Sequence, residues 1–147
     1  MDDIVRLAHL EELKRLKARY FLYLDHKQWA RWGALFCEDA VMDVSAQFPE
    51  APDPSIHIMR GRDAILQAVS KAVGTTITVH HGHAPVIDLH SEDEATGIWA
   101  LEDNLFMASG TRMQGFGHYH ERYRRIDGAW LISETRLTRL KILLSRD

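Results

Sequence analysis

The amino-acid sequence predicts an α+β domain, in which helices pack on one face of a curved antiparallel sheet. Over most of the first 73 residues, apolar side chains recur at intervals of three and four, which is the period of amphipathic helices. From Thr75 onward, apolar residues alternate with polar ones, and turn signals separate the alternating runs. Helices followed by a series of neighbouring strands are typical of the α+β class.

Three helices are expected, over residues 4–25, 28–37 and 62–73. The first has one apolar stripe, formed by Ile4, Leu7, Leu10, Leu13, Leu16, Tyr20 and Leu24. Its charged residues, Lys17 among them, are expected on the opposite side. The second is shorter, and its apolar face consists of Trp29, Trp32, Leu35 and Phe36. Each helix therefore has one face to bury against the sheet.

A short strand is expected over residues 40–45, before a proline-rich stretch. Residues 46–60 contain Pro49, Pro52 and Pro54. Because proline lacks a backbone donor and fixes φ, this stretch is expected to be a mobile loop.

The second half of the chain predicts strands over residues 75–82, 84–90, 95–106, 115–126 and 129–140. Turn signals separate them, at Ser91-Glu92-Asp93, Ser109-Gly110 and Asp127-Gly128. The last of these is a strong signal for a two-residue hairpin. The strands are therefore expected to form an antiparallel meander.

Length, charge and cysteine content narrow the class of protein. The 147 residues suit one domain over 1–147, and a net charge of −3 does not favour nucleic acid as a partner. Cys37 is the only cysteine, so no intrachain disulfide forms. The acidic start of the chain does not resemble a signal peptide, and no run approaches the roughly 20 apolar residues of a membrane span. A cytoplasmic location without membrane contact is expected.

Two charged residues fall on apolar strand faces. Asp103 alternates with Trp99 and Leu101, and Arg139 alternates with Thr135 and Leu137. A buried charge needs a partner, so an Asp103–Arg139 pair would account for both positions. The pair could be purely structural, or it could line a site.

The densest group of titratable side chains is His80-His81-Gly82-His83. Only one of the neighbours His80 and His81 can face the interior of a strand. Asp25 ends the first helix, where a carboxylate is unfavourable, which suggests that an imidazole requires it for orientation. The alternatives are a hydrogen-bonded edge histidine and a solvated helix end.

Other motifs carry weaker signals. His118 and His120 share one face of a strand and could hold a metal, as could the cluster around His80, but neither pattern brings three ligands together. The glycines fit no phosphate-binding spacing, and no Ser or Cys nucleophile motif is present.

Three stretches together resemble the SnoaL-like branch of the nuclear-transport-factor-2-like superfamily, and within it the bile-acid 7α-dehydratases. They read RYFLYLD over residues 19–25, HHGHAP over 80–85 and ATGIWALED over 95–103. Residues 123–130 and 137–139 extend the resemblance, and the chain is also similar to scytalone dehydratase and lindane dehydrochlorinase. The proline-rich stretch has no counterpart in the dehydratases.

The resemblance implies a cone-shaped barrel, with a curved sheet and a long helix enclosing one pocket. Carried across position by position, it implies five catalytic residues: Tyr20, Asp25, His80, Asp103 and Arg139. Tyr119, Trp99 and Leu24 are expected to contact the substrate. No cofactor and no metal are expected.

The implied activity is a lyase that eliminates water from a polycyclic or hydroaromatic hydroxy-ketone. His80 would act as general base, oriented by Asp25, while Tyr20 would donate a hydrogen bond to the substrate oxygen. An isomerase or polyketide cyclase would need the same base, and a non-catalytic protein that binds a small hydrophobic ligand would need only the pocket. A homo-oligomer is expected, with a trimer favoured over a dimer.

Overall fold

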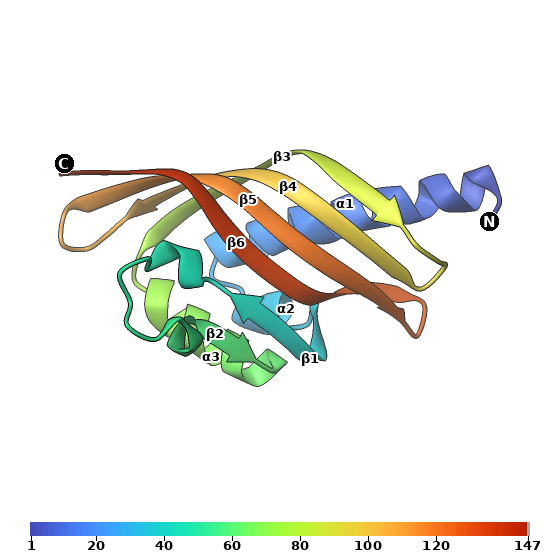
Figure 1. The fold of residues 1–147 in the computed structure, drawn as a ribbon, viewed down its shortest axis with the longest axis horizontal. Coiled ribbons are helices and arrows are strands. Elements are labelled where there is room, and N and C mark those ends of the chain that lie inside the picture. Colours follow the sequence, from blue (N-terminus) through green and yellow to red (C-terminus); the bar gives the residue numbers. More distant parts are fainter. Residues whose placement is uncertain (147) are drawn as a thin grey trace.

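The structure, a computed structural model, describes residues 1–146 and has the predicted α+β architecture (Figure 1). The helices are α1 (Asp3–Asp25), α2 (Trp29–Gly33) and α3 (Arg62–Val73). The strands are β1 (Phe36–Asp43), β2 (Ile58–Arg60), β3 (Ile77–Leu89), β4 (Glu94–Phe106), β5 (Thr111–Ile126) and β6 (Ala129–Arg146). Within this part of the chain, no helix combines the length and apolar character needed to cross a bilayer.

The strands form one sheet in the order β2-β1-β6-β5-β4-β3. All neighbouring pairs are antiparallel except β1 and β6, which are parallel. The predicted hairpin between β5 and β6 is confirmed, with Asp127 and Gly128 both at positive φ. Over residues 1–146 the sheet curves but stays open, so it is not the closed barrel that the resemblance implied.

Several element boundaries differ from the prediction. Helix α2 ends at Gly33, and Phe36 begins β1, because a short apolar run suits a helix and a buried strand equally well. The two strands expected over 75–82 and 84–90 are one strand, β3, interrupted only by a bulge between His83 and Val86.

The proline-rich stretch has more regular structure than a plain loop. It contains two 3₁₀ turns, η1 (Ser45–Gln47) and η2 (Pro54–His57), and then β2. The side chain of Asp53 caps η2 by accepting a hydrogen bond from the backbone N–H of Ser55. Asp43, at the end of β1, accepts one from the backbone N–H of Ser45. Its mobility remains a prediction.

Helix α1 lies along the sheet beside β3, and its amino-terminal end projects beyond the strands (Figure 1). Ile4 and Leu7, which the stripe pattern placed in the core, are therefore exposed, at 76% and 64% of their surface. Lys17 is fully buried, so its predicted place on the polar side was wrong. It follows Leu13 by four residues and precedes Tyr20 by three, which puts it on the same face as both.

Candidate active site

A cavity of about 290 Å³ lies between the inner face of the sheet, the end of α1, helix α3 and the η1–η2 segment. Most of its lining is apolar and includes Leu24, Met42, Val69 and Leu137. Its polar groups include Tyr20, His80, Asp103 and Tyr119. A mostly apolar wall with a few polar groups suits a small organic ligand held in one orientation.

The Asp25 and His80 side chains are in direct contact at one side of this cavity. The Nδ1 atom of His80 lies 2.7 Å from Oδ1 of Asp25, and the His80 backbone N–H donates to Oδ2 at 2.9 Å. The Thr78 hydroxyl also donates to Oδ1, at 2.9 Å. Since Asp25 occupies Nδ1, the Nε2 atom of His80 is the ring nitrogen that remains for a ligand. The alternation of β3 directs His80 inward and leaves His81 exposed.

The hydrogen bonds to Asp25 determine its charge state. Burial raises the pKa of Asp25, but the hydrogen bonds from His80 and Thr78 outweigh this and hold the pKa below its usual value. The carboxylate therefore stays ionised at the carboxyl end of α1, where the helix dipole disfavours it.

The lowered pKa of Asp25 predicts how stability depends on pH. The carboxylate stabilises the folded protein above its unfolded pKa, about 3.9, and this contribution is lost as pH falls through the lower folded value. We expect wild type to exceed D25N in unfolding free energy by a constant amount near neutrality, and the gap to narrow below about pH 4. Urea denaturation across pH tests this, with D88N, which alters an exposed carboxylate, as control. A gap that widens in acid would contradict it.

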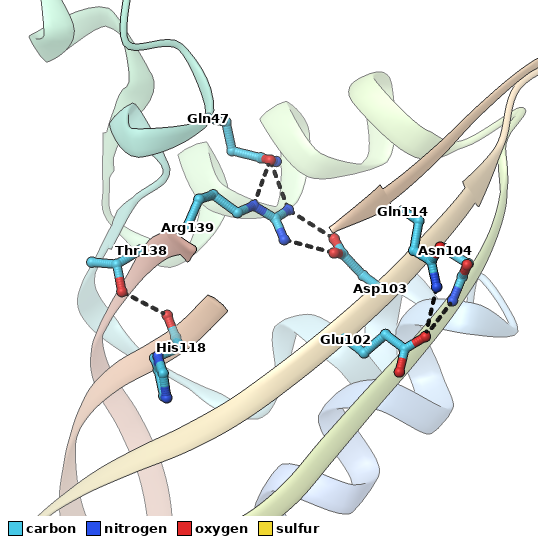
Figure 2. Close-up of polar contacts among 8 residues, drawn as sticks. All are labelled: Gln47, Glu102, Asp103, Asn104, Gln114, His118, Thr138 and Arg139. Carbon is cyan, nitrogen blue, oxygen red and sulfur yellow. Dashed lines mark hydrogen bonds and ion pairs between the residues drawn. The ribbon is translucent and has the colours of Figure 1, made fainter. Parts of the chain in front are cut away.

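The predicted Asp103–Arg139 pair is confirmed as a contact (Figure 2). The Arg139 guanidinium donates to both carboxylate oxygens of Asp103, at 2.6 and 2.9 Å. Its Nε and Nη2 atoms also donate to Oε1 of Gln47, at 3.0 and 2.7 Å. Both charged side chains are only 6% exposed. Asp103 thus presents a compensated carboxylate to the cavity, and Arg139 connects β6 to turn η1.

Because Gly115 has no side chain, it provides the space that this ion pair occupies. It lies directly opposite Asp103 in the β4–β5 ladder, and a methyl group there would collide with the Arg139 guanidinium and the Asp103 carboxylate. We expect G115A to displace the pair and lower the unfolding free energy by about 1–3 kcal/mol. Urea denaturation measures this loss. Q114A, at the neighbouring position, is the control, and equal stability of G115A and wild type would refute the expectation.

The remaining predicted site residues differ in whether they reach the cavity. Tyr20, Tyr119 and Leu24 line the cavity, whereas Trp99 does not. The indole N–H of Trp99 instead donates to the hydroxyl of Tyr123 at 2.9 Å, in the layer behind the cavity wall. Burial raises the pKa of Tyr20, and the negative charge of Glu121 raises it further, so its hydroxyl stays protonated as a donor.

Four polar residues at or near the cavity escaped the sequence analysis: Lys17, Glu121, Gln47 and His57. Lys17 and Glu121 form a fully buried ion pair, with Nζ 2.8 Å from Oε2. Spacing could have revealed both, since Lys17 follows the helical stripe and Glu121 alternates with Tyr119 and Tyr123. Gln47 lies in a short turn, where no periodic signal exists.

Of the remaining histidines, His57 in turn η2 lines the cavity, whereas those singled out in the sequence lie away from it. His118 and His120 share the outer face of β5, with ring centroids 6.3 Å apart, while His81 and His83 are exposed on β3. Among residues 1–146, no three side chains of the metal-binding types converge.

Comparisons with known proteins agree with this fold. The "Probable cyclase FGR4" of Gibberella zeae is 27% identical over 140 residues, which cover 87% of this chain and 89% of that protein. A proposed scytalone dehydratase from Novosphingobium aromaticivorans has a TM-score of 0.84 at 23% identity, over 97% of this chain and 91% of its own. Hexachlorocyclohexane dehydrochlorinase LinA-type3 from Novosphingobium barchaimii has a TM-score of 0.83 at 20% identity, over 98% and 94%. At these identities the two structures show a shared fold.

The family model for the SnoaL-like domain matches residues 5–136, which include α1 from Val5 onward, all six strands as far as Arg136 and every cavity-lining residue except Leu137. The motifs in the sequence and the open curved sheet agree with that match. The chain therefore belongs to the SnoaL-like domain family.

Proposed function

We propose that this protein is a cofactor-independent lyase of the dehydratase type, which acts on a polycyclic or hydroaromatic hydroxy-ketone. The contact between Asp25 and His80 at the wall of an apolar cavity is the observation that carries the proposal. An imidazole held by a carboxylate on one nitrogen is a general base on the other. The dehydratase and dehydrochlorinase structures with the same fold are named for eliminations.

In the proposed reaction, Nε2 of His80 removes a proton from the carbon next to the substrate carbonyl. The electron pair of that C–H bond moves toward the carbonyl oxygen, which gains negative charge and accepts a hydrogen bond from Tyr20. When the pair returns, a C=C bond forms and the C–O bond to the leaving hydroxyl breaks. The imidazolium then gives its proton to that hydroxyl, and water departs. Asp25 stabilises the imidazolium in between.

Asp103 acts on the substrate hydroxyl in this proposal. Its carboxylate lines the cavity and is held by Arg139, so it accepts a hydrogen bond and does not give a proton. That hydrogen bond orients the leaving group toward His80. Arg139 and Gln47 keep Asp103 in place without touching the substrate.

The cavity favours a compact substrate. Its volume of about 290 Å³ lies at the lower end of the roughly 300–1,000 Å³ found for ligand pockets. A substrate of two or three fused rings fits this space better than a four-ring steroid. Leu24 and Tyr119 would contact its apolar rings, and Trp99 would support that wall through Tyr123.

Mass-resolved product analysis tests this function. Purified protein would be incubated with two- and three-ring hydroxy-ketones and with 7-hydroxy-3-oxo-4-ene steroids. We expect a product lighter by one water from the smaller compounds and none from the H80A variant. Absence of any new species across the panel would count against a lyase and favour a protein that only binds such ligands.

A cyclase or isomerase is the second candidate function. It is favoured by the Gibberella zeae relative, which is named as a probable cyclase, and it needs the same base but no leaving group. Its product would keep the mass of the substrate. A new species of unchanged mass would therefore replace the dehydratase assignment with this one.

We also propose that the protein forms a homo-oligomer through the outer face of its sheet. Val86 and Ile98 are cross-strand partners there and are 62% and 42% exposed. Apolar side chains in such a position suit a subunit contact. Light scattering on the eluting protein is expected to give a trimer mass, and a V86K/I98K variant is expected to dissociate. A wild-type protein with the mass of one chain would disprove this.

A further inference from the structure

A buried cation lies directly behind the two tyrosines of the cavity. The Lys17 ammonium is 3.8 Å from the centre of the Tyr20 ring and 3.6 Å from that of Tyr119. Both rings line the cavity, whereas Lys17 does not and is fully buried. Any ligand that touches the tyrosines is thus separated from this charge by one aromatic ring.

Glu121 holds the ammonium in this position. Its carboxylate accepts hydrogen bonds from Lys17 at 2.8 Å, from Thr135 at 2.7 Å and from Tyr123 at 2.8 Å. Three donors on one carboxylate suit its ionised form, so the pair is an ammonium and a carboxylate. Burial lowers the pKa of Lys17 below its usual value, although the charge and hydrogen bond of Glu121 oppose part of that shift.

Stability alone does not explain such a pair. Replacing a buried ion pair with apolar residues of similar volume is often neutral or stabilising. Here the carboxylate is surrounded by donors that fix it, and the ammonium faces the π-systems of both cavity tyrosines. The arrangement therefore places a positive charge closest to the two cavity tyrosines, with the Phe21 ring farther away at 5.0 Å.

We propose that Lys17 is a positioning residue, which holds the rings of Tyr20 and Tyr119 and strengthens their hydroxyls as donors to a negatively charged oxygen on the ligand. This inference rests on the proposed function. When the hydroxyl donates to an oxyanion, electron density shifts into the phenol ring, and the attraction between the ring and the ammonium grows. The stabilisation is thus larger for the charged transition state than for the neutral substrate.

Ligand binding tests the role of the charge separately from the packing. The probes are 4-nitro-1-naphthol, ionised at the assay pH, and 1-methyl-4-nitronaphthalene, a neutral molecule of the same shape. The K17M/E121Q variant removes both charges, and the glutamine can still bond to Thr135 and Tyr123. K17R keeps the cation, and K14M, on the exposed side of α1, is the matched control. Calorimetry gives the affinities, and thermal unfolding confirms that each variant folds.

We expect K17M/E121Q to bind the naphtholate about tenfold more weakly than wild type, with the affinity for the neutral probe unchanged. K17R and K14M are expected to keep the preference for the naphtholate. An equal loss for both probes, or no loss for either, would overturn the inference, since the pair would then serve packing alone. If K17M/E121Q does not fold, the K17R variant provides the test. Loss of the preference for the naphtholate in K17R would also overturn the inference.

The Y20F variant separates this inference from the proposed function. If Y20F loses the naphtholate preference and K17M/E121Q keeps it, Tyr20 acts as proposed and Lys17 does not. If wild-type protein shows no preference at all, the role of Tyr20 as an oxyanion donor fails together with that of Lys17. Product-mass analysis then still decides whether His80 catalyses an elimination.

Discussion

Replacing His80 with alanine is expected to lower kcat by about 10²–10⁴-fold, the usual contribution of a positioned general base. The reason is geometric: Asp25 occupies Nδ1, and the side chain lines the cavity, so the ring offers one nitrogen to a ligand. KM should change far less, because the apolar walls that bind the substrate remain. The measurement is steady-state kinetics on the substrate identified by product mass.

His81 supplies the matched control for this prediction. It is the next residue along β3, but it is exposed on the opposite face of the sheet. H81A is therefore expected to keep wild-type kcat, and D25N to lose activity because the imidazole is no longer oriented. If H80A and H81A turn over equally well, the base is another residue and the proposed mechanism is wrong.

Period-two alternation in the sequence is enough to locate half of the candidate site. It singles out Asp103 on β4, where Ala95, Trp99 and Leu101 are buried on the same face. On β6 it identifies Arg139, but the same alternation continued toward the start of the strand would also put Leu131 and Ser133 on the buried face. A register shift in the β5–β6 ladder puts Trp130 and Ile132 on the buried side instead. A bulge reverses alternation, and no residue type marks it in the sequence.

The residues that the sequence analysis missed are those whose placement depends on tertiary packing. Lysines are almost never fully buried unless paired, so residue type predicts an exposed Lys17, although its spacing fits the buried stripe. Its partner Glu121 comes from β5, 104 positions along the chain. Gln47 meets Arg139 only because the proline-rich stretch folds back over β6. Contacts between residues so far apart in the sequence depend on the overall fold, and a local sequence pattern cannot predict them.

The two ends of the cavity wall use charge differently. At His80, the negative partner Asp25 lies behind the group that would move a proton. At Asp103, the positive partner Arg139 lies behind the carboxylate and donates to both of its oxygens. In both places a side chain of opposite charge lies behind a cavity-lining group, and such a partner offsets the cost of a charge beside apolar rings. This division suggests that His80 transfers protons while Asp103 only orients the ligand.

Breaking the Asp103–Arg139 pair is expected to have the largest effect on stability. R139M leaves the Asp103 carboxylate buried without its guanidinium, and we expect a loss of about 3–5 kcal/mol in unfolding free energy. The control is the exposed pair of Arg122 and Glu134, whose side chains are 71% and 49% exposed. R122M should cost less than about 1 kcal/mol. Urea denaturation of both variants makes the comparison, and similar losses would show that burial does not strengthen the Asp103 pair.

The double variant D103L/R139M decides what the pair is for. Removing both charges leaves no unpaired ion in the core, so we expect it to recover most of the stability lost in R139M. If Asp103 orients the leaving hydroxyl, the recovered protein should still have a kcat well below that of wild type, about tenfold or more, since one charge-assisted hydrogen bond is missing. A double variant with wild-type stability and wild-type kcat would make the pair purely structural. The base at His80 would then have to carry both the proton removal and the orientation of the leaving group.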